Sequence, residues 1–114
     1  MTLNANTTLT TTDSAVTLGA SLDSFDTTPR DLAVNSGNGL ITLGGTVGAT
    51  HALGAVTFNS VGVRILGGNI STTGSQTYVG VVLLGANTIL NTTNDAVTFS
   101  STLDSTATTP FDMI

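Results

Sequence analysis

The chain has 114 residues, of which 39% are hydrophobic and only 8% are charged, and its formal net charge is −5. Its two Arg and complete lack of Lys exclude a nucleic-acid binder, because such a protein needs cationic side chains to displace phosphate counterions. The lack of Lys and Glu also excludes an exposed amphipathic helix, and the lack of Cys excludes disulfides, thiolate zinc sites and a cysteine nucleophile.

Short strands, bounded by Gly, Asn, Asp or Ser, are expected along the whole chain. Thr and Val fit a pleated sheet surface better than a helix, and apolar residues alternate with Thr at a period of two, as in Ala15–Leu18. The sequence therefore predicts an all-β protein without a long helix. In chain order, we predict strands at Leu32–Asn35, Leu40–Leu43, Ala55–Phe58, Val63–Leu66, Thr77–Leu84 and Ala96–Phe99.

A long internal repeat organises these strands. When Ala5 is aligned with Ala86, residues 5–33 match residues 86–114 at 16 of 29 positions, without a gap. Such self-similarity is the mark of a repeat architecture. We therefore predict that residues 1–114 are a single β-solenoid segment, with one 81-residue unit and the opening third of the next.

A shorter period lies inside the long one. A pattern of one apolar, two small, one polar and one apolar residue recurs, and the intervals between its first residues are 25, 23, 18 and 15. Their mean, about 20 residues, is typical of one solenoid turn, so we predict a parallel β-helix of five to six coils. Thr would stack over Thr in a hydroxyl ladder, and Leu18, Leu43 and Leu66 would form one column. The pattern leaves open which residue of Ile65–Leu66 and of Leu83–Leu84 points inward, and its anchors are Leu18, Leu43, Leu66, Leu84 and Phe99. A sandwich or barrel is the alternative, but such folds seldom carry a unit that restarts in phase.

Four short motifs carry a resemblance to a known family. They are DLAVN at Asp31–Asn35, GGTVG at Gly44–Gly48, TTGSQTYVG at Thr72–Gly80 and LGANT at Leu84–Thr88. Nearly the whole chain resembles the repeats of very large exported bacterial surface proteins of the filamentous-haemagglutinin type, including autotransporter-like adhesins. The resemblance implies a right-handed parallel β-helix that is secreted and displayed on the bacterial cell surface. The N-terminal haemagglutination domain usual in that family has no counterpart in these residues.

A non-catalytic structural role follows from these observations. We expect a stalk segment of a surface adhesin that supports adhesion, biofilm or fibre formation, with no cofactor. Its expected partners are neighbouring repeats of the same chain stacked end to end, with self-association through the open solenoid ends. We expect no membrane insertion, because the longest apolar run, Val81–Leu84, has four residues. Residues 1–6 lack the pattern of a signal peptide, so an exported protein would carry its signal elsewhere.

Two other functions compete with the stalk. A carbohydrate-binding or carbohydrate-cleaving β-helix would use some of the seven Asp, but there is no Trp and only one Tyr to form a sugar platform. Asp26 is replaced by Ala107 in the second copy, and calcium-binding nonapeptides are absent, so we expect solvated turn residues. An ice-binding face would need Thr-x-Thr on every coil, and Thr8–Thr10 is followed by Ile89–Asn91 and Val63–Ile65 instead.

No residue is predicted to be catalytic, to bind a cofactor or to hold a metal. His51, the one His, is expected to be an exposed loop residue, and Arg64 is expected to face outward between apolar neighbours. Tyr78 is expected in the core. Phe25 and Phe111 lie in loops, and they are the candidate contact residues for a partner.

Overall fold

A computed structural model describes residues 1–105. Within them the chain forms short parallel strands and no helix, which confirms the predicted fold class. In chain order the strands are β1 (Thr2–Leu3), β2 (Thr7–Thr10), β3 (Val16–Leu18), β4 (Asp23–Ser24), β5 (Leu32–Gly37), β6 (Ile41–Leu43), β7 (Val56–Ile65), β8 (Asn69–Ser71), β9 (Gln76–Leu84), β10 (Ile89–Asn91), β11 (Val97–Phe99) and β12 (Leu103–Ser105).

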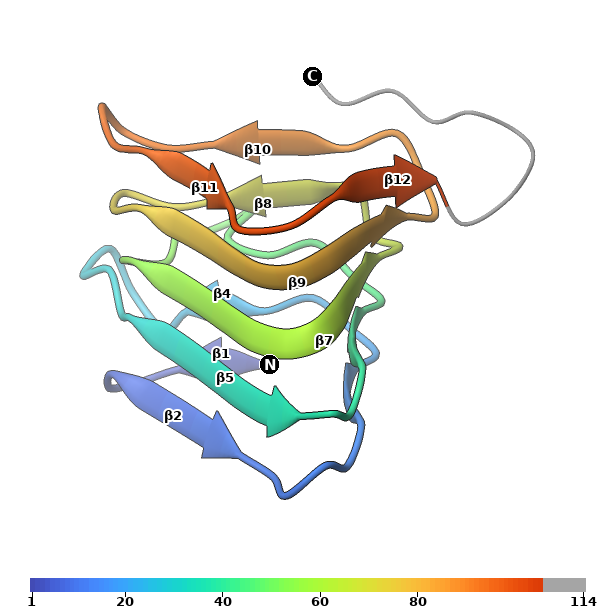
Figure 1. The fold of residues 1–114 in the computed structure, drawn as a ribbon. Helices are drawn as coiled ribbons and strands as arrows, with labels where there is room; N and C mark the ends of the chain where they lie inside the picture. Colours follow the sequence, from blue (N-terminus) through green and yellow to red (C-terminus); the bar gives the residue numbers. More distant parts are fainter. Residues whose placement is uncertain (106–114) are drawn as a thin grey trace.

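The strands form a right-handed solenoid of about five coils that rises from β1 and β2 to β10, β11 and β12 (Figure 1). Each coil has three faces. The first face contains β2, β5, the first half of β7, the first half of β9, and β11. The second face contains β3, β6, the second halves of β7 and β9, and β12. The third face contains β1, β4, a bridge at Val47, β8 and β10.

Successive coils pair in parallel because side chains of similar shape lie over one another. The clearest column on the first face runs from Leu9 through Val34, Phe58 and Tyr78 to Phe99. The rings of Phe58 and Tyr78 stack with centroids 5.5 Å apart, and those of Tyr78 and Phe99 with centroids 5.2 Å apart. Since burial of apolar area is the main favourable term in folding, these inward columns hold the coils together.

The third face has its own aliphatic column, and here the spacing of the coils can be read directly. Leu22 lies beside Val47, Val47 beside Ile70, and Ile70 beside Leu90. These members are separated by 25, 23 and 20 positions in turn, so coils of unequal length still stack in register. The differences in length are absorbed by the corners and by a loop at residues 48–52.

The column predicted through Leu18, Leu43 and Leu66 is wrong at Leu66, one of the two places where the sequence left the inward residue open, and the anchor Phe99 belongs to another column. Leu18, Leu43 and Leu84 do share a column, but its remaining member is Ile65 rather than Leu66. Ile65 is buried and Leu66 is 39% exposed, because a slip of one residue turns a side chain to the other side of the strand. Phe99 lies on the first face above Tyr78, whereas Leu84 is followed in its own column by Ser105. The repeat therefore does not restart on the face where it began.

Thr residues stack only in part, and their hydroxyls do not act as predicted. Thr57, Thr77 and Thr98 lie in register on the outside of the first face. The Thr hydroxyls that donate a recorded hydrogen bond, however, donate to main-chain carbonyl oxygens, either at a turn, as from Thr11 to Ser14 at 2.6 Å, or in a neighbouring coil, as from Thr73 to Leu53 at 3.3 Å. Thr therefore stabilises the turns between strands, since a hydroxyl can satisfy a carbonyl that no strand partner reaches.

Two predicted strands are joined in the structure into the ten-residue strand β7, and both β7 and β9 bend where the first face meets the second (Figure 1). In β9 the bend is at Gly80, whose φ is +105°. An added Cβ there would lie 2.8 Å from the carbonyl carbon of Val61 in the coil below, in addition to the backbone strain. Gly is required at this corner because L-residues rarely adopt a positive φ.

This geometry predicts that Gly80→Ala destabilises the fold by about 1–3 kcal/mol, the usual range for a strained backbone conformation. Gly19→Ala is the matched control, because an added Cβ at Gly19 has nothing within 4 Å. We expect the control to leave the free energy of unfolding unchanged, or to raise it by less than about 1 kcal/mol. Urea unfolding followed by circular dichroism measures both, and equal effects of the two substitutions would contradict the assignment.

Candidate functional site: the loop between β4 and β5

The candidate contact residue Phe25 begins the loop of residues 25–30, which joins β4 on the third face to β5 on the first. Its side chain is 59% exposed, the highest value among the large apolar side chains described. Its backbone N–H donates to the carbonyl oxygen of Leu3 in the coil below at 2.8 Å. The exposed ring is thus attached to a fixed backbone position. The other candidate, Phe111, lies outside the described residues.

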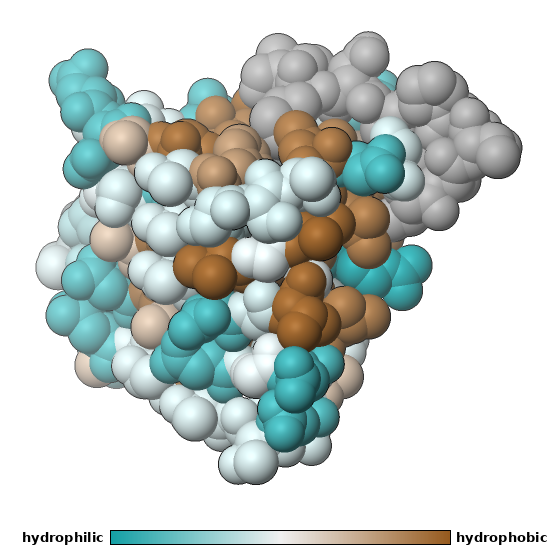
Figure 2. Space-filling model, in the orientation of Figure 1, coloured by the Kyte–Doolittle hydropathy of each residue, from teal (hydrophilic) through white to brown (hydrophobic). Residues whose placement is uncertain are grey.

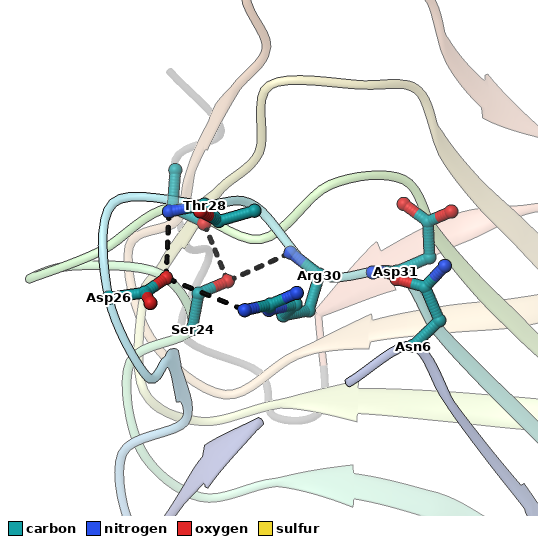
Figure 3. Close-up of polar contacts among 7 residues, drawn as sticks. Asn6, Ser24, Asp26, Thr28, Arg30 and Asp31 are labelled. Atoms are coloured by element: carbon teal, nitrogen blue, oxygen red, sulfur yellow. Dashed lines mark hydrogen bonds and ion pairs between the residues drawn. The ribbon is translucent and has the colours of Figure 1, made fainter. Parts of the chain in front are cut away.

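Ser24 holds the base of this loop (Figure 3). Its buried hydroxyl accepts a hydrogen bond from the backbone N–H of Arg30 at 3.0 Å and donates to the carbonyl oxygen of Ala52 at 2.9 Å. Inside the loop, the Asp26 carboxylate accepts from the backbone N–H of Thr28 at 2.9 Å. The loop is therefore closed by its own side chains, in the way Asp and Ser commonly stabilise turns.

The one ion pair among the described residues also belongs to this loop. The Arg30 guanidinium lies 3.7 Å from Asp26, whose side chain is 49% exposed (Figure 3). An exposed pair of this kind contributes about 0–1 kcal/mol to stability. Within residues 1–105, the Nε of Arg30 has no hydrogen-bond partner. An exposed aromatic ring beside an ion pair can support contact with a partner surface.

Three Asp carboxylates connect one coil to the next, a role that the sequence reading missed. Asp13 accepts from the backbone N–H of Asn38, Asp23 from that of Thr50 at 2.9 Å, and Asp31 from that of Ala55 at 2.8 Å. Asp13 and Asp31 are exposed outside the strands, as expected, but all three carboxylates also satisfy a backbone donor one coil further along. The regular spacing of Asp near predicted corners was the signal that could have revealed this.

The carboxylates do not converge on a common point. Among residues 1–105 there is no group of three or more metal-ligating side chains and no pocket. The aromatic rings that could have formed a sugar platform, Phe58, Tyr78 and Phe99, are stacked in the interior instead. No groove with paired carboxylates and aromatic rings therefore exists in the described part of the chain.

His51 lies in the predicted loop, after the bridge at Val47, but its side chain is half-buried rather than exposed. The carbonyl oxygen of His51 accepts from the backbone N–H of Ser24 at 3.1 Å, and its own backbone N–H donates to the Asp23 carboxylate at 3.3 Å. The contact between Asp23 and His51 thus involves the main chain, which is not the geometry of a catalytic triad. Arg64 faces outward between the buried Val63 and Ile65, as predicted.

A buried polar cluster lies in the interior between the first and third faces. The Tyr78 hydroxyl donates to Oε1 of Gln76 at 2.8 Å, and both side chains are fully buried. Nε2 of Gln76 donates to the carbonyl oxygen of Asn91 at 2.8 Å and to that of Ile70 at 3.2 Å. Tyr78 was expected in the core; Gln76 was not, because a lone Gln on a strand reads as an outward residue. Burial raises the pKa of Tyr78 well above its ordinary value.

The outer surface carries no regular Thr-x-Thr array within residues 1–105. Thr57, Thr77 and Thr98 form one outward column. The neighbouring outward column contains Asn59 and Val79 instead of Thr, so the Thr-x-Thr pattern is broken. The segments Ile89–Asn91 and Val63–Ile65, compared with Thr8–Thr10 in the sequence analysis, lie on other faces. Figure 2 shows this side of the molecule, where hydrophobic residues lie among hydrophilic ones. Val61 in β7 is one exposed apolar residue of the chain, at 46%.

A scan against protein-family models and searches of the curated proteins and of the solved structures found no match to this chain. In the part of the chain that the structure describes, no helix has the length and hydropathy needed to cross a membrane. The fold of the chain, a parallel β-solenoid, is therefore established by its strand pairing alone.

The Asp contacts between coils predict that Asp31→Ala lowers the free energy of unfolding by about 1 kcal/mol, because the N–H of Ala55 loses its acceptor. Asp95→Ala is the matched control, since that exposed carboxylate bonds only to the N–H of the next residue. The control should change stability by less than about 0.5 kcal/mol. Urea unfolding of both variants measures the difference. If Asp31→Ala left the free energy of unfolding unchanged, the role of Asp31 in connecting the coils would be contradicted.

Burial of Tyr78 predicts a specific dependence of stability on pH. In the unfolded chain its phenol ionises near its ordinary pKa of 10.0, while in the folded chain burial raises this pKa. Above pH 10 the folded state therefore holds a proton that the unfolded state has lost, and stability falls by up to about 1.4 kcal/mol per pH unit. Below pH 10 this contribution is constant.

Absorbance of tyrosinate and circular dichroism, recorded together from pH 8 to 13, test this expectation on the single tyrosine of the chain. Tyrosinate should appear only as the fold is lost. The variant Tyr78→Phe supplies the control, because its stability should lack this decline. Ionisation at pH 10 in a chain that keeps its circular dichroism would show that the phenol is accessible.

Proposed function

We propose that this chain is a stalk segment of a secreted bacterial surface adhesin of the filamentous-haemagglutinin type, without catalytic activity. The observation that carries the proposal is the unbroken pairing of coil on coil along residues 1–105. The first and second faces each form a continuous ladder, and on the third face bridges at Val47 connect two short sheets. This coil-on-coil shape supports the role of a spacer. The motifs quoted from the sequence connect this shape with exported adhesins.

The polar groups of the chain support the same role. Asp13, Asp23 and Asp31 bond to the backbone of the following coil. Asp26 is paired with Arg30. Charged side chains thus serve the scaffold, and with 8% charged residues the surface would permit close packing of neighbouring stalks.

The partners that we propose are neighbouring repeats stacked end to end, with self-association through the open ends. β2 at one end and β10 at the other each pair with a strand on one side only among the described residues. An unpaired strand edge is a template for a further strand. Phe25, exposed at the side of the solenoid, remains the candidate residue for lateral contact with a partner.

The location and the non-catalytic role can be tested together. Antibodies raised against the chain should label intact cells of the organism that encodes it, and mild external protease should remove the label. Labelling only after the cells are permeabilised would contradict a surface stalk. The purified chain should release no sugar from a panel of acidic and neutral polysaccharides, and release would favour the carbohydrate-cleaving β-helix instead.

A further inference from the structure

The two copies of the repeated segment have the same local structure. Asp13 and its counterpart Asn94 both have φ of 57°. The Thr11 hydroxyl donates to the carbonyl oxygen of Ser14 at 2.6 Å, and its counterpart in Thr92 donates to that of Asp95 at 2.6 Å. Strand β3 at Val16–Leu18 recurs in the second copy as β11 at Val97–Phe99. The corner and strand are thus the same module, used twice.

The two copies nevertheless lie on different faces. β2 belongs to the first face, but the segment that repeats it, β10, pairs with β8 on the third face. β3 belongs to the second face, and its repeat β11 pairs with β9 on the first. The corner at Asp13 therefore joins the first face to the second, whereas the matching corner at Asn94 joins the third face to the first.

The chain path shows the size of this displacement. From β2 to β10 the chain moves to the next face eleven times, through β3, β4, β5, β6, Val47, both halves of β7, β8 and both halves of β9. With three faces per turn, eleven steps are three and two-thirds turns. The 81-residue unit is therefore one third of a turn short of four whole turns.

The inward residues explain why the displaced copy fits. Leu9, Val16 and Leu22 of the first copy recur as Leu90, Val97 and Leu103 in the second. In the first copy these three residues are covered from above by Val34, Ile41 and Val47, in that order.

In the second copy, Leu90 lies over Ile70 and Val97 lies over Gln76. Leu103 is 40% exposed. Within residues 1–105 no strand pairs with the upper edge of β10, β11 or β12. That edge presents the same three inward side chains that the first copy presents to β5, β6 and Val47.

We infer that the edge formed by β10, β11 and β12 is the binding surface for the continuation of the second 81-residue unit, which lies in the solenoid rotated by one third of a turn relative to the first unit. The occupant is a coil with the sequence of residues 32–47, and its β5 segment pairs with β10 rather than with β11. A surface feature of the unit is then displayed on three sides of the solenoid in turn, and its orientation returns after three units. This stacking order is independent of the proposed location, so cell-surface labelling does not bear on it.

Disulfide trapping in an extended chain tests the rotation. The chain consists of all 114 residues followed by a second copy of residues 34–85, which continues the repeat where residues 106–114 repeat 25–33. Thr10 and Asn35 are in register in the first unit, so Thr10→Cys with Asn35→Cys in the 114-residue chain is the positive control. Neighbouring parallel strands are close enough for a disulfide, and the chain has no other Cys.

In the extended chain, Asn35→Cys is placed in the appended copy only. If the appended coil is rotated as we infer, its introduced Cys lies over Asn91, which is the counterpart of Thr10. A second Cys at Asn91 (Asn91→Cys) should therefore form a disulfide to the same extent as the control. If the β5 segment of the appended copy instead lay on the first face, as β5 does in the first unit, the introduced Cys would lie over Ser100, which follows Phe99. Disulfide formation with Ser100→Cys, or with neither position while the control reacts, would overturn the inference.

Urea unfolding of the Cys-free extended chain gives an independent measurement. If the appended coils stack on the described edge, the slope of unfolding free energy against urea should exceed that of the 114-residue chain, because more surface becomes exposed on unfolding. An unchanged slope would show that the appended segment does not pack on this edge, and would also overturn the inference.

Discussion

The stacking of each coil in register on the one below is the constraint on which this structure depends. A coil of about 21 residues cannot bury its inward side chains alone, so every Leu, Val, Ile or Phe column needs a neighbour on both sides. The aromatic column through Phe58, Tyr78 and Phe99 shows the result, with rings stacked at nearly constant separation. The corners follow from this demand: coils of unequal length keep their columns by placing extra residues in loops.

The polar groups also help to hold neighbouring coils together. Inside, Gln76 and Tyr78 satisfy one another and also backbone carbonyls of the neighbouring strands, so a polar cluster is tolerated in the core. Outside, Asp carboxylates at the corners accept from the backbone of the next coil. With these groups used by the scaffold, little chemistry remains on the described surface beyond the exposed Phe25 and the ion pair of Asp26 with Arg30. Such a surface supports the spacer role that we propose.

The repeat and the solenoid have different periods, and their mismatch shapes the surface. The 81-residue unit fills three and two-thirds turns, so its copies occupy successive faces instead of lying above one another. This is possible because the three faces offer inward positions of similar size, filled by Leu or Val in both copies. A long repeat can thus produce a solenoid whose sides are alike, even though no single coil has three equal sides.

The amino-acid sequence by itself determined the all-β class and, through its internal repeat, the stacked coils. It also placed the strands β5, β6, β7, β9 and β11, because residue type and a period of two act locally. It also indicated that Tyr78 is internal and Arg64 external. Only the tertiary structure decided that Ile65 rather than Leu66 points inward, that Gln76 is buried, and that Phe99 lies above Tyr78. These outcomes depend on which strand of one coil pairs with which strand of the next. A shift of one residue or one face leaves the local strand preference of the sequence unchanged. Packing between segments that lie one coil apart in the sequence selects among such arrangements.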